Sequence, residues 1–278
     1  MRVIVAQHCG FCFGVKRALE MAKETTSTGE RIWTDGPIIH NSQEVARLEQ
    51  NGIRHLKSDD ELSKGDVVLL RAHGVTRIRK AELIGKGVKV VDATCPRVAK
   101  AQKIIHDYTS KGYTGIIIGD HNHAEIRSIL GHAEGPCVVV ANGNEANKVS
   151  EDMAPFVVIS QTTFNIYEIE NLLSLLPLNA ERDHIVETIC DATQKRQKAA
   201  REIASLADVV FVVGGYHSAN TARLAEVCRA ENPRTYHIET ASEITREHVE
   251  GAKIAGVTAG ASTPDWVIEE VREKLESL

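Results

Sequence analysis

The stretch VKVVDATCPRVAKAQKII, residues 88–105, holds the pattern from which the fold of the chain can be derived. Its β-branched run at Val88–Val91 predicts a buried strand. Cys95 follows this strand, and Pro96 suits the first turn of a helix, where its missing N–H leaves no helical hydrogen bond unmade. The stretch therefore predicts a strand, a cysteine and a helix, in that order.

The same alternation of short β-branched runs and helical patterns continues on both sides of this stretch. Further strands are predicted at Val3–Ala6, Val67–Leu70, Gly115–Ile118, Phe156–Ile159, Ile185–Ile189, Val209–Val213 and Lys253–Val257. Such alternation is typical of parallel sheets whose strands are joined by crossover helices. The chain of 278 residues is therefore predicted to be an α/β protein.

Residue types also indicate where two of the helices begin. Ser42 is a candidate N-cap for a helix that Gly52 would end in a left-handed conformation. Thr263 is a second candidate cap, with Pro264 in the first turn and Asp265 as an acid that the helix dipole favours. Both residues predict a helix start.

Three cysteines and three polar residues recur at one fixed spacing. The cysteines are separated by 83 and 95 residues, and the polar residues are separated by the same two intervals. In every third of the chain, the polar residue lies 28 residues after the cysteine. The pairs are Cys12 with His40, Cys95 with His123, and Cys190 with Ser218.

A second polar loop follows a further strand in each third. These loops are 71–74, 161–163 and 259–262, and their marker residues His73, Thr162 and Ser262 lie 61, 67 and 72 residues after the cysteines. Equivalent features at similar intervals predict three diverged copies of one structural unit. The predicted α/β modules are residues 14–97, 98–190 and 191–278.

All nine marked positions are junctions between a strand and a helix. Parallel sheets bind ligands beyond the carboxyl ends of their strands, so each module would present its polar loops on one edge. Three modules that face a common axis would bring the three thiols together at the centre. A cysteine at a helix N-terminus also has its thiolate form favoured by the helix dipole.

The cysteine pattern favours an iron–sulfur cluster over zinc. Structural zinc sites usually have paired CxxC motifs, and Cys9 with Cys12 is the single pair of that kind. Three thiolates suit a four-iron cluster that leaves one iron open to substrate. A zinc site that includes His73 or His123 stays an alternative. Structural roles are expected for Cys9, Cys137 and Cys228.

The polar residues at the junctions are mostly neutral hydrogen-bond donors. The set is His40, Asn41, His73, His123, Glu125, Thr162, Ser218, Asn220 and Ser262. Hydroxyl, amide and imidazole groups beside helix N-termini are suited to an anion. Because the chain has no Walker A motif and no GxGxxG motif, a small phosphorylated substrate is expected rather than a nucleotide.

Composition and charge exclude several classes of protein. The net charge of −5 gives no general attraction to nucleic acid or to an anionic membrane. No apolar run approaches the roughly 20 residues that a bilayer crossing needs, and the first residues do not form a secretory signal. We therefore expect a cytoplasmic protein with no nucleic-acid or membrane partner. In that reducing compartment, cysteines are expected to bind a metal or to act in catalysis rather than to form disulfides.

The motifs together resemble the 4-hydroxy-3-methylbut-2-enyl diphosphate reductase family, the last enzymes of the non-mevalonate isoprenoid pathway. They are GFCFGV, IIHN, AHGV, DATCP, HAE, SQTT, the IC before DATQKRQ, HSANTARLAE and TAGASTPD, in order from residue 10 to residue 265. The resemblance implies a trefoil of the three modules around a central [4Fe–4S] cluster. It also implies that the N-terminal strand, within residues 1–13, packs on the third module.

The resemblance further implies a reaction and a set of site residues. The hydroxyl of the allylic diphosphate would be removed by two electrons and two protons, giving isopentenyl and dimethylallyl diphosphates. Electrons would come from a reduced ferredoxin or flavodoxin. The cluster ligands would be Cys12, Cys95 and Cys190, with one iron open. The diphosphate would be bound by His40, His73, His123, Ser218, Asn220 and Ser262, with Thr163 and Ala219 beside them. Glu125, Thr162 and His123 would serve catalysis at the hydroxyl.

The sequence departs from the family pattern at two places in these motifs. Ala219 stands where many relatives have a second serine, so one diphosphate contact is lost or is made by the backbone. The loop Asp120–Glu125 lacks the proline that many relatives have before the glutamate, at the position of Ala124.

Two other functions fit part of the pattern. A redox or iron sensor would use the same cluster but needs an output surface for nucleic acid, and this acidic chain shows no basic helix suited to it. A thiol–disulfide enzyme would need paired cysteines, and the three candidates lie in three different modules.

Overall fold

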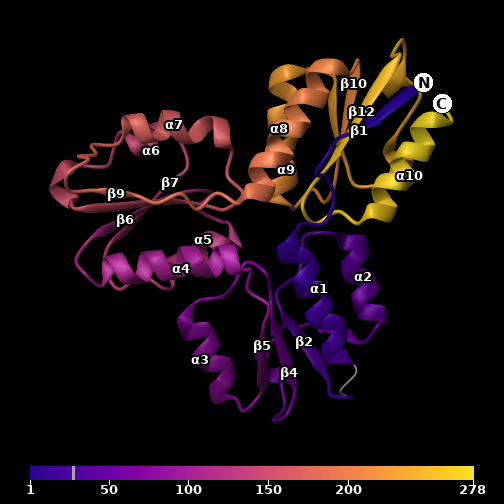
Figure 1. The fold of residues 1–278 in the computed structure, drawn as a ribbon. Helices are drawn as coiled ribbons and strands as arrows, with labels where there is room; N and C mark the ends of the chain where they lie inside the picture. The colour runs from indigo at the N-terminus through magenta and orange to yellow at the C-terminus, as the bar shows by residue number, and fades with distance from the viewer. Residues whose placement is uncertain (27–28) are drawn as a thin grey trace. The chain divides into compact units, whose positions relative to one another are not determined.

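The computed structural model describes residues 1–26 and 29–278. Its strands form three separate sheets of four strands each, and every strand pairing is parallel. Helices follow the strands throughout (Figure 1). The predicted fold class, α/β with three repeated modules, is confirmed.

The first sheet has the order β3-β2-β4-β5. Its elements are β2 (Ile32–Asp35), β3 (Ile53–His55), β4 (Val67–Leu70) and β5 (Lys89–Asp92), with α1 (Phe13–Thr26), α2 (Ser42–Gln50) and α3 (Arg77–Gly85). A short 3₁₀ helix, η1 (Asp59–Glu61), precedes β4. One core cluster packs Leu83 of α3 against Val68 and Leu70 of β4.

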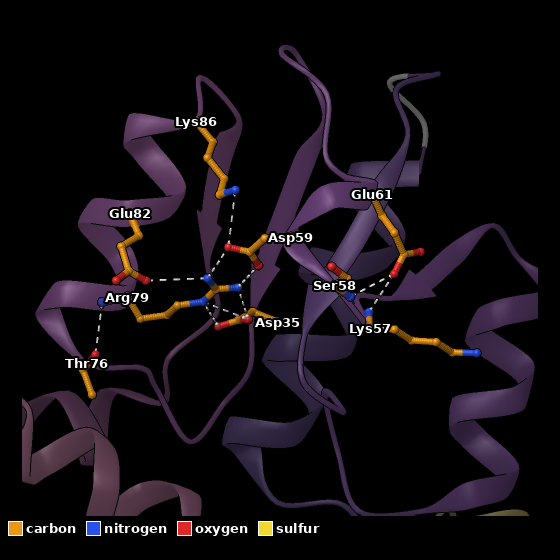
Figure 2. Close-up of polar contacts among 9 residues, drawn as sticks. All are labelled: Asp35, Lys57, Ser58, Asp59, Glu61, Thr76, Arg79, Glu82 and Lys86. Carbon is orange, nitrogen blue, oxygen red and sulfur yellow. Dashed lines mark hydrogen bonds and ion pairs between the residues drawn. The ribbon is translucent and has the colours of Figure 1, made fainter.

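An ion-pair network holds α3 against the first sheet (Figure 2). The Arg79 guanidinium donates to Asp35 at the end of β2, with an Nη2–Oδ1 distance of 2.9 Å, and to both oxygens of Asp59 at 2.7 Å. Thr76 caps α3 by accepting a hydrogen bond from the Arg79 N–H at 3.1 Å. Charge-assisted bonds of this kind fix geometry as well as adding energy. They orient the helix that directly follows the loop of His73.

The second sheet has the order β7-β6-β8-β9. Its elements are β6 (Thr114–Ile118), β7 (Cys137–Val140), β8 (Phe156–Ser160) and β9 (His184–Ile185), with α4 (Pro96–Thr109), α5 (Ala124–Leu130), α6 (Gly143–Ala146) and α7 (Ile166–Leu175), and with η2 (Glu151–Met153) before β8. Alternate residues of β6 and β8 pack toward α4 and α5 on one face and toward α7 on the other. Strands buried on both faces are typical of parallel sheets.

The third sheet has the order β1-β12-β10-β11 and is built from both ends of the chain. Its elements are β1 (Arg2–Val5), β10 (Val209–Val213), β11 (Thr235–Ile238) and β12 (Ile254–Ala259), with α8 (Asp191–Leu206), α9 (Ala219–Glu231), α10 (Asp265–Glu276) and the 3₁₀ turns η3 (Ala241–Glu243) and η4 (Glu247–Val249). Figure 1 shows α10 on one face of this sheet and α8 with α9 on the other, as the two core clusters require. β1 pairs with β12, with Arg2 opposite Ile254.

The three sheets share one strand order when they are aligned by their cysteines. Each cysteine follows an edge strand, β5, β9 or β1, and the neighbour of that strand is β4, β8 or β12. The third module therefore obtains its edge strand from the N-terminus of the chain. This shared order is the structural form of the repeat that the spacing predicted.

Contacts divide the described residues into two compact units. The first unit contains residues 1–16, 39–46 and 191–278, and the second contains 17–38 and 47–190. The third sheet lies in the first unit, and the other two sheets lie in the second. Each unit is described by itself below.

Three sequence-based expectations about elements need correction. Ser42 is the first residue of α2 and does not cap it; instead, Asn41 Oδ1 accepts a hydrogen bond from the Glu44 N–H at 2.9 Å. Thr263 does not cap α10, since its hydroxyl donates to the Val213 carbonyl at 2.9 Å and the helix begins at Asp265 after Pro264.

The predicted strand at Ile185–Ile189 is also wrong in its extent, because β9 ends at Ile185. The reason is Thr188, whose hydroxyl accepts from the Ser160 N–H at 2.8 Å and donates to the Ser160 carbonyl at 2.6 Å. A side chain thus replaces the backbone partner that a longer strand would supply. The strands β2, β3, β7 and β11 were not among the expected ones; each has four residues or fewer.

Candidate functional site

The three candidate cysteines have the same backbone contact, each within its own unit. Each donates its N–H to the carbonyl of a residue in the second polar loop of its sheet: Cys12 to Ala261 at 3.1 Å, Cys95 to Ala72 at 2.9 Å, and Cys190 to Thr162 at 3.0 Å. Each also stands directly before a helix, α1, α4 or α8. The loops that carry the thiols are therefore anchored in the same way three times.

The three thiols are half-buried, and none of the six cysteines forms a disulfide within the described residues. Cys12 lies in the first unit, and Cys95 and Cys190 lie in the second. Within residues 1–26 and 29–278, no group of three His, Cys, Asp or Glu side chains is arranged to hold a metal ion. Of the other cysteines, Cys228 is fully buried and burial raises its pKa to about 12, while Cys137 lies in β7 with its pKa also raised by burial.

Three polar residues cap the helices of the first polar loops and keep a donor unused by the cap. His123 Nδ1 accepts from the Glu125 N–H at 3.2 Å, so the proton of the neutral ring is on Nε2. Ser218 Oγ accepts from the Thr221 N–H at 3.3 Å, and its own O–H stays available. Asn41 accepts through Oδ1, which leaves its amide N–H groups to donate. Each helix start thus adds a side-chain donor to its free backbone amides.

His73 and His123 lie together in the second unit. Their ring centroids are 5.3 Å apart, in an edge-to-face arrangement. The loop of His73 is held by Ser128 of α5, whose hydroxyl donates to the Val75 carbonyl at 3.1 Å. The spacing of the repeats predicts neither contact, because in each the two residues belong to different repeats.

Gly74 shows how tightly this loop is packed. Its φ of +71° favours glycine, and a Cβ there would lie 2.5 Å from Gln102 Nε2 and 2.7 Å from Ser128 Oγ. Gln102 donates to Ser128 at 2.7 Å, and both side chains are buried. Gln102 and Ser128 were not predicted from the sequence to lie near the site. Each is a polar residue on the apolar face of its helix, and that pattern could have indicated a buried polar contact.

Glu125 and Thr162 form a buried pair in the second unit. Thr162 donates its N–H to Oε1 at 2.6 Å and its hydroxyl to Oε2 at 2.8 Å. The two residues are 1% and 5% exposed. Burial raises the pKa of Glu125 to about 7, although both hydrogen bonds from Thr162 act in the opposite direction. A carboxyl group with this pKa can hold a proton and release it near neutral pH.

The loop before Glu125, residues 120–124, contains no proline, and Gln161 restrains it. Gln161 Oε1 accepts from the Asp120 N–H at 3.0 Å, and the His123 N–H donates to the Asp120 carbonyl at 2.9 Å. Gln161 Nε2 also donates to the Thr163 hydroxyl at 3.0 Å. One side chain therefore joins the loop of His123 to the loop of Thr162.

The first unit contains the remaining polar residues. The Ser262 hydroxyl donates to the His40 carbonyl at 3.3 Å, so these two loops touch. Asn220 Nδ2 is buried and has no hydrogen-bond partner within the described residues. Ala219 is the first residue of α9 and carries one of the free N–H groups of that helix.

Comparison with known proteins identifies the family. The family model described as "LytB protein" matches residues 3–276. The chain belongs to the LytB protein family. A LytB relative from Geotalea uraniireducens, named 4-hydroxy-3-methylbut-2-enyl diphosphate reductase, is 44% identical over 278 residues, which cover 100% of this chain and 98% of the relative. A relative from Caldanaerobacter subterraneus with the same name is also 44% identical, over 286 residues, covering 100% of this chain and 98% of that one.

Solved LytB structures agree with this relationship. The structure of an (E)-4-hydroxy-3-methyl-but-2-enyl diphosphate reductase, described as the terminal enzyme of the non-mevalonate pathway, is 37% identical, with a TM-score of 0.71 and full coverage of both chains. A reductase from Plasmodium falciparum has a TM-score of 0.92 at 24% identity, covering 100% of this chain and 87% of that one, and supports the fold alone. In the described part of this LytB chain, no helix has the length and apolar character that a bilayer crossing requires.

Proposed function

We propose that this chain is a reductase that removes the hydroxyl of 4-hydroxy-3-methylbut-2-enyl diphosphate, giving isopentenyl and dimethylallyl diphosphates. The observation that carries the proposal is the 44% identity over the full chain with relatives named for this activity. The reaction consumes two electrons and two protons, and the hydroxyl leaves as water. The chain must therefore bind a small diphosphate, supply protons and receive electrons.

The LytB family is one of iron–sulfur enzymes, and the cysteines of this chain fit such a cluster. Cys12, Cys95 and Cys190 form no disulfide, are half-buried and stand directly before helix N-termini, where thiolates are favoured. In our proposal they hold a [4Fe–4S] cluster with one iron left open. When bound, the cluster supplies electrons and a Lewis-acidic iron for the hydroxyl oxygen.

The diphosphate would be bound by polar groups at the junctions between strands and helices. They are His40, His73, His123, Ser218, Asn220 and Ser262, with Thr163 and the backbone N–H of Ala219. The Ser218 hydroxyl, the His123 Nε2 proton and the unpartnered Asn220 amide support this role. Neutral donors and helix amides stabilise an anion without the need for a lysine.

Glu125 and Thr162 would deliver a proton at the substrate hydroxyl, with His123 beside them. The Thr162 hydroxyl contacts Glu125 directly, so it can relay a proton between this carboxyl and a bound alcohol. A pKa of about 7 keeps a sizeable fraction of Glu125 protonated at neutral pH. The electron donor in the proposal is a reduced ferredoxin or flavodoxin.

The test of the proposal is a matched pair of cysteine variants in the second unit. Cys95→Ser should lose most of its iron and acid-labile sulfide and all turnover of the allylic diphosphate, because a neutral hydroxyl is a poor iron ligand. Cys137→Ser, also at a half-buried thiol, should keep both. Iron, sulfide and turnover are measured after anaerobic purification, and a full cluster in Cys95→Ser would contradict the ligand assignment.

A further inference from the structure

We propose that α3 and the start of α4, in the second unit, form the docking surface for an acidic electron-transfer protein that delivers electrons beside Cys95. The inference rests on the proposed function, because a two-electron reduction needs an electron source. It adds the place of contact and the chemical character of the partner. Charge, access and apolar exposure each support it.

The charge of this region is opposite to that of the chain. Residues 77–111 contain nine lysines and arginines and three acidic residues, a net charge of +6, whereas the whole chain carries −5. The remainder therefore carries −11. Cys95 lies in the middle of the basic segment. Acids outside the segment offset part of this charge, because Asp59 pairs with Arg79 and Glu134 pairs with Arg77. The positive charge that remains attracts an acidic partner and speeds its association.

An open cavity gives this surface access to the loop of Cys95. Its volume is about 320 Å³, and its lining includes Thr94, the residue before Cys95. Arg77 and Lys80 of α3 contribute cationic groups, while Val75 and Ile84 contribute apolar ones. The Thr94 carbonyl accepts a hydrogen bond from Arg17 at 3.2 Å within the same unit, which helps to fix the loop. A partner on this surface would lie one residue from a proposed cluster ligand.

α3 also carries two exposed apolar side chains, of which Ile84 lines the cavity. Ile78 is 72% exposed and Ile84 is 57% exposed. Exposed apolar side chains among charges are typical of sites that bind another protein. Nucleic acid would satisfy the cations but has little to pair with two isoleucines, so an acidic protein is the better match. Weak electron-transfer complexes bury small interfaces. A helix of nine residues such as α3 can supply an interface of that size.

The basic side chains of α3 divide into two groups. Arg79 and Lys86 point toward Asp59 and stabilise the module (Figure 2). Arg77 and Lys80 reach the cavity instead; they contact Glu134 and Asp92, and their side chains stay 45% exposed. Lys100 is an exposed lysine of α4. Lys80 and Lys100 can therefore be changed without removing the Arg79 network.

The test measures binding of a reduced, acidic [2Fe–2S] ferredoxin to the anaerobic holoenzyme. Lys80→Gln/Lys100→Gln and, separately, Ile78→Glu should each weaken binding by about 10-fold at low salt, because rim charges steer association. The charge effect should shrink at about 200 mM salt, where the Debye length is below 10 Å. Matched controls outside the surface, Lys148→Gln/Lys198→Gln and Leu206→Glu at another exposed apolar residue, should bind as the wild type does.

Turnover is measured in parallel with the ferredoxin and with reduced methyl viologen, a small reductant that needs no docking surface. The variants should lose ferredoxin-driven turnover and keep viologen-driven turnover. Unchanged ferredoxin binding in both variants would overturn the proposal, as would displacement of the ferredoxin by an equal concentration of duplex DNA. Because binding is read separately, weakened binding supports docking even if the wild type failed to turn over, a result that would contradict only the proposed function.

Discussion

Glu125 shows how much the chemistry of a residue depends on its surroundings. An acid near a helix start ordinarily complements the dipole, a contribution of about 0.3–1 kcal/mol at an exposed site. Glu125 is 1% exposed and receives two hydrogen bonds from Thr162. Burial dominates over these bonds and raises its pKa to about 7. The residue is therefore an acid that holds its proton near neutral pH.

Glu125→Gln should lower turnover by about 10²–10⁴-fold, with cluster and substrate binding retained. Glutamine keeps the size and hydrogen bonding of the side chain but delivers no acidic proton. In the wild type, turnover should also fall as pH rises through about 7, where Glu125 loses its proton. The control is Glu170→Gln, at an exposed residue of α7. A Glu125→Gln enzyme within a few-fold of the wild type would refute the assignment.

The same residue should influence stability with a defined sign. The folded pKa of about 7 lies above the ordinary 4.5, so the folded state binds more protons between these values. The contribution of Glu125 is therefore fully present below pH 4.5 and lost as pH rises to about 7. At 1.36 kcal/mol per pKa unit the loss is about 3 kcal/mol. The melting temperature of Glu125→Gln should rise relative to the wild type between about pH 5 and pH 8, and a constant difference would contradict this account.

At the scale of the element, helix starts combine a structural role with the binding role that we propose. Ser218 caps α9 through its oxygen, and the proposed diphosphate contact uses its proton. Asn41 and His123 share this division at α2 and α5. The side chain that stops a helix from fraying is thus also the one oriented for an anion. A single substitution can affect both properties, and they need to be separated.

Ser218→Ala and Ser218→Asp should separate capping from binding. Alanine removes the cap, at a cost of about 1 kcal/mol of stability, and weakens substrate binding roughly 10- to 150-fold, the equivalent of about 1.5–3 kcal/mol. Aspartate keeps the cap and its stability but repels the diphosphate, so binding should be weaker still. Anaerobic calorimetry and melting temperatures give both quantities.

Asn142→Ala, which removes the cap of α6, is the matched control and should leave affinity unchanged. Equal affinity in the wild type and in both Ser218 variants would show that the diphosphate lies elsewhere.

At the scale of the whole molecule, the third sheet closes the chain on itself. β1 supplies the edge strand that β5 and β9 supply in the other sheets, and it pairs along its full length with β12. Met1 and Leu278 both pack against the same core cluster. The two ends of the chain belong to one module (Figure 1). This closure makes β1, the strand before Cys12, the edge strand of a sheet whose other strands lie between residues 209 and 259.

A circular permutant should therefore fold. Joining Leu278 to Met1 with a short glycine–serine linker and opening the chain at Gly112, in the exposed turn between α4 and β6, should preserve melting temperature to within a few degrees and full iron content. Opening at Leu69 within β4, which is fully buried, is the control and should abolish folding. A Gly112 permutant that fails to fold would contradict the pairing of β1 with β12.

The sequence by itself determined the alternation of strands and helices, the three repeats and the cysteine at each strand end. These features are local, since a strand, a cap or a proline acts within a few residues, and the interval of 28 residues between the cysteine and its polar residue is the same in all three modules. Gly52, with a φ of +85°, ends α2 as expected. Short strands such as β3 carry too little pattern to be recognised, and Asn41 and Ser42 are both good caps, so their choice depends on the neighbouring chain.

Only the tertiary structure decided which residues far apart in the sequence are in contact. Thr162 reaches Glu125 over 37 residues, and Ser128 reaches Val75 over 53. Spacing cannot supply these pairs, because they depend on how separate sheets and helices pack. The raised pKa of Glu125 has the same origin, since desolvation is a property of the surrounding core and not of the residue. The residue types can be read from the sequence, but packing determines the pKa of Glu125 and its hydrogen-bond partner.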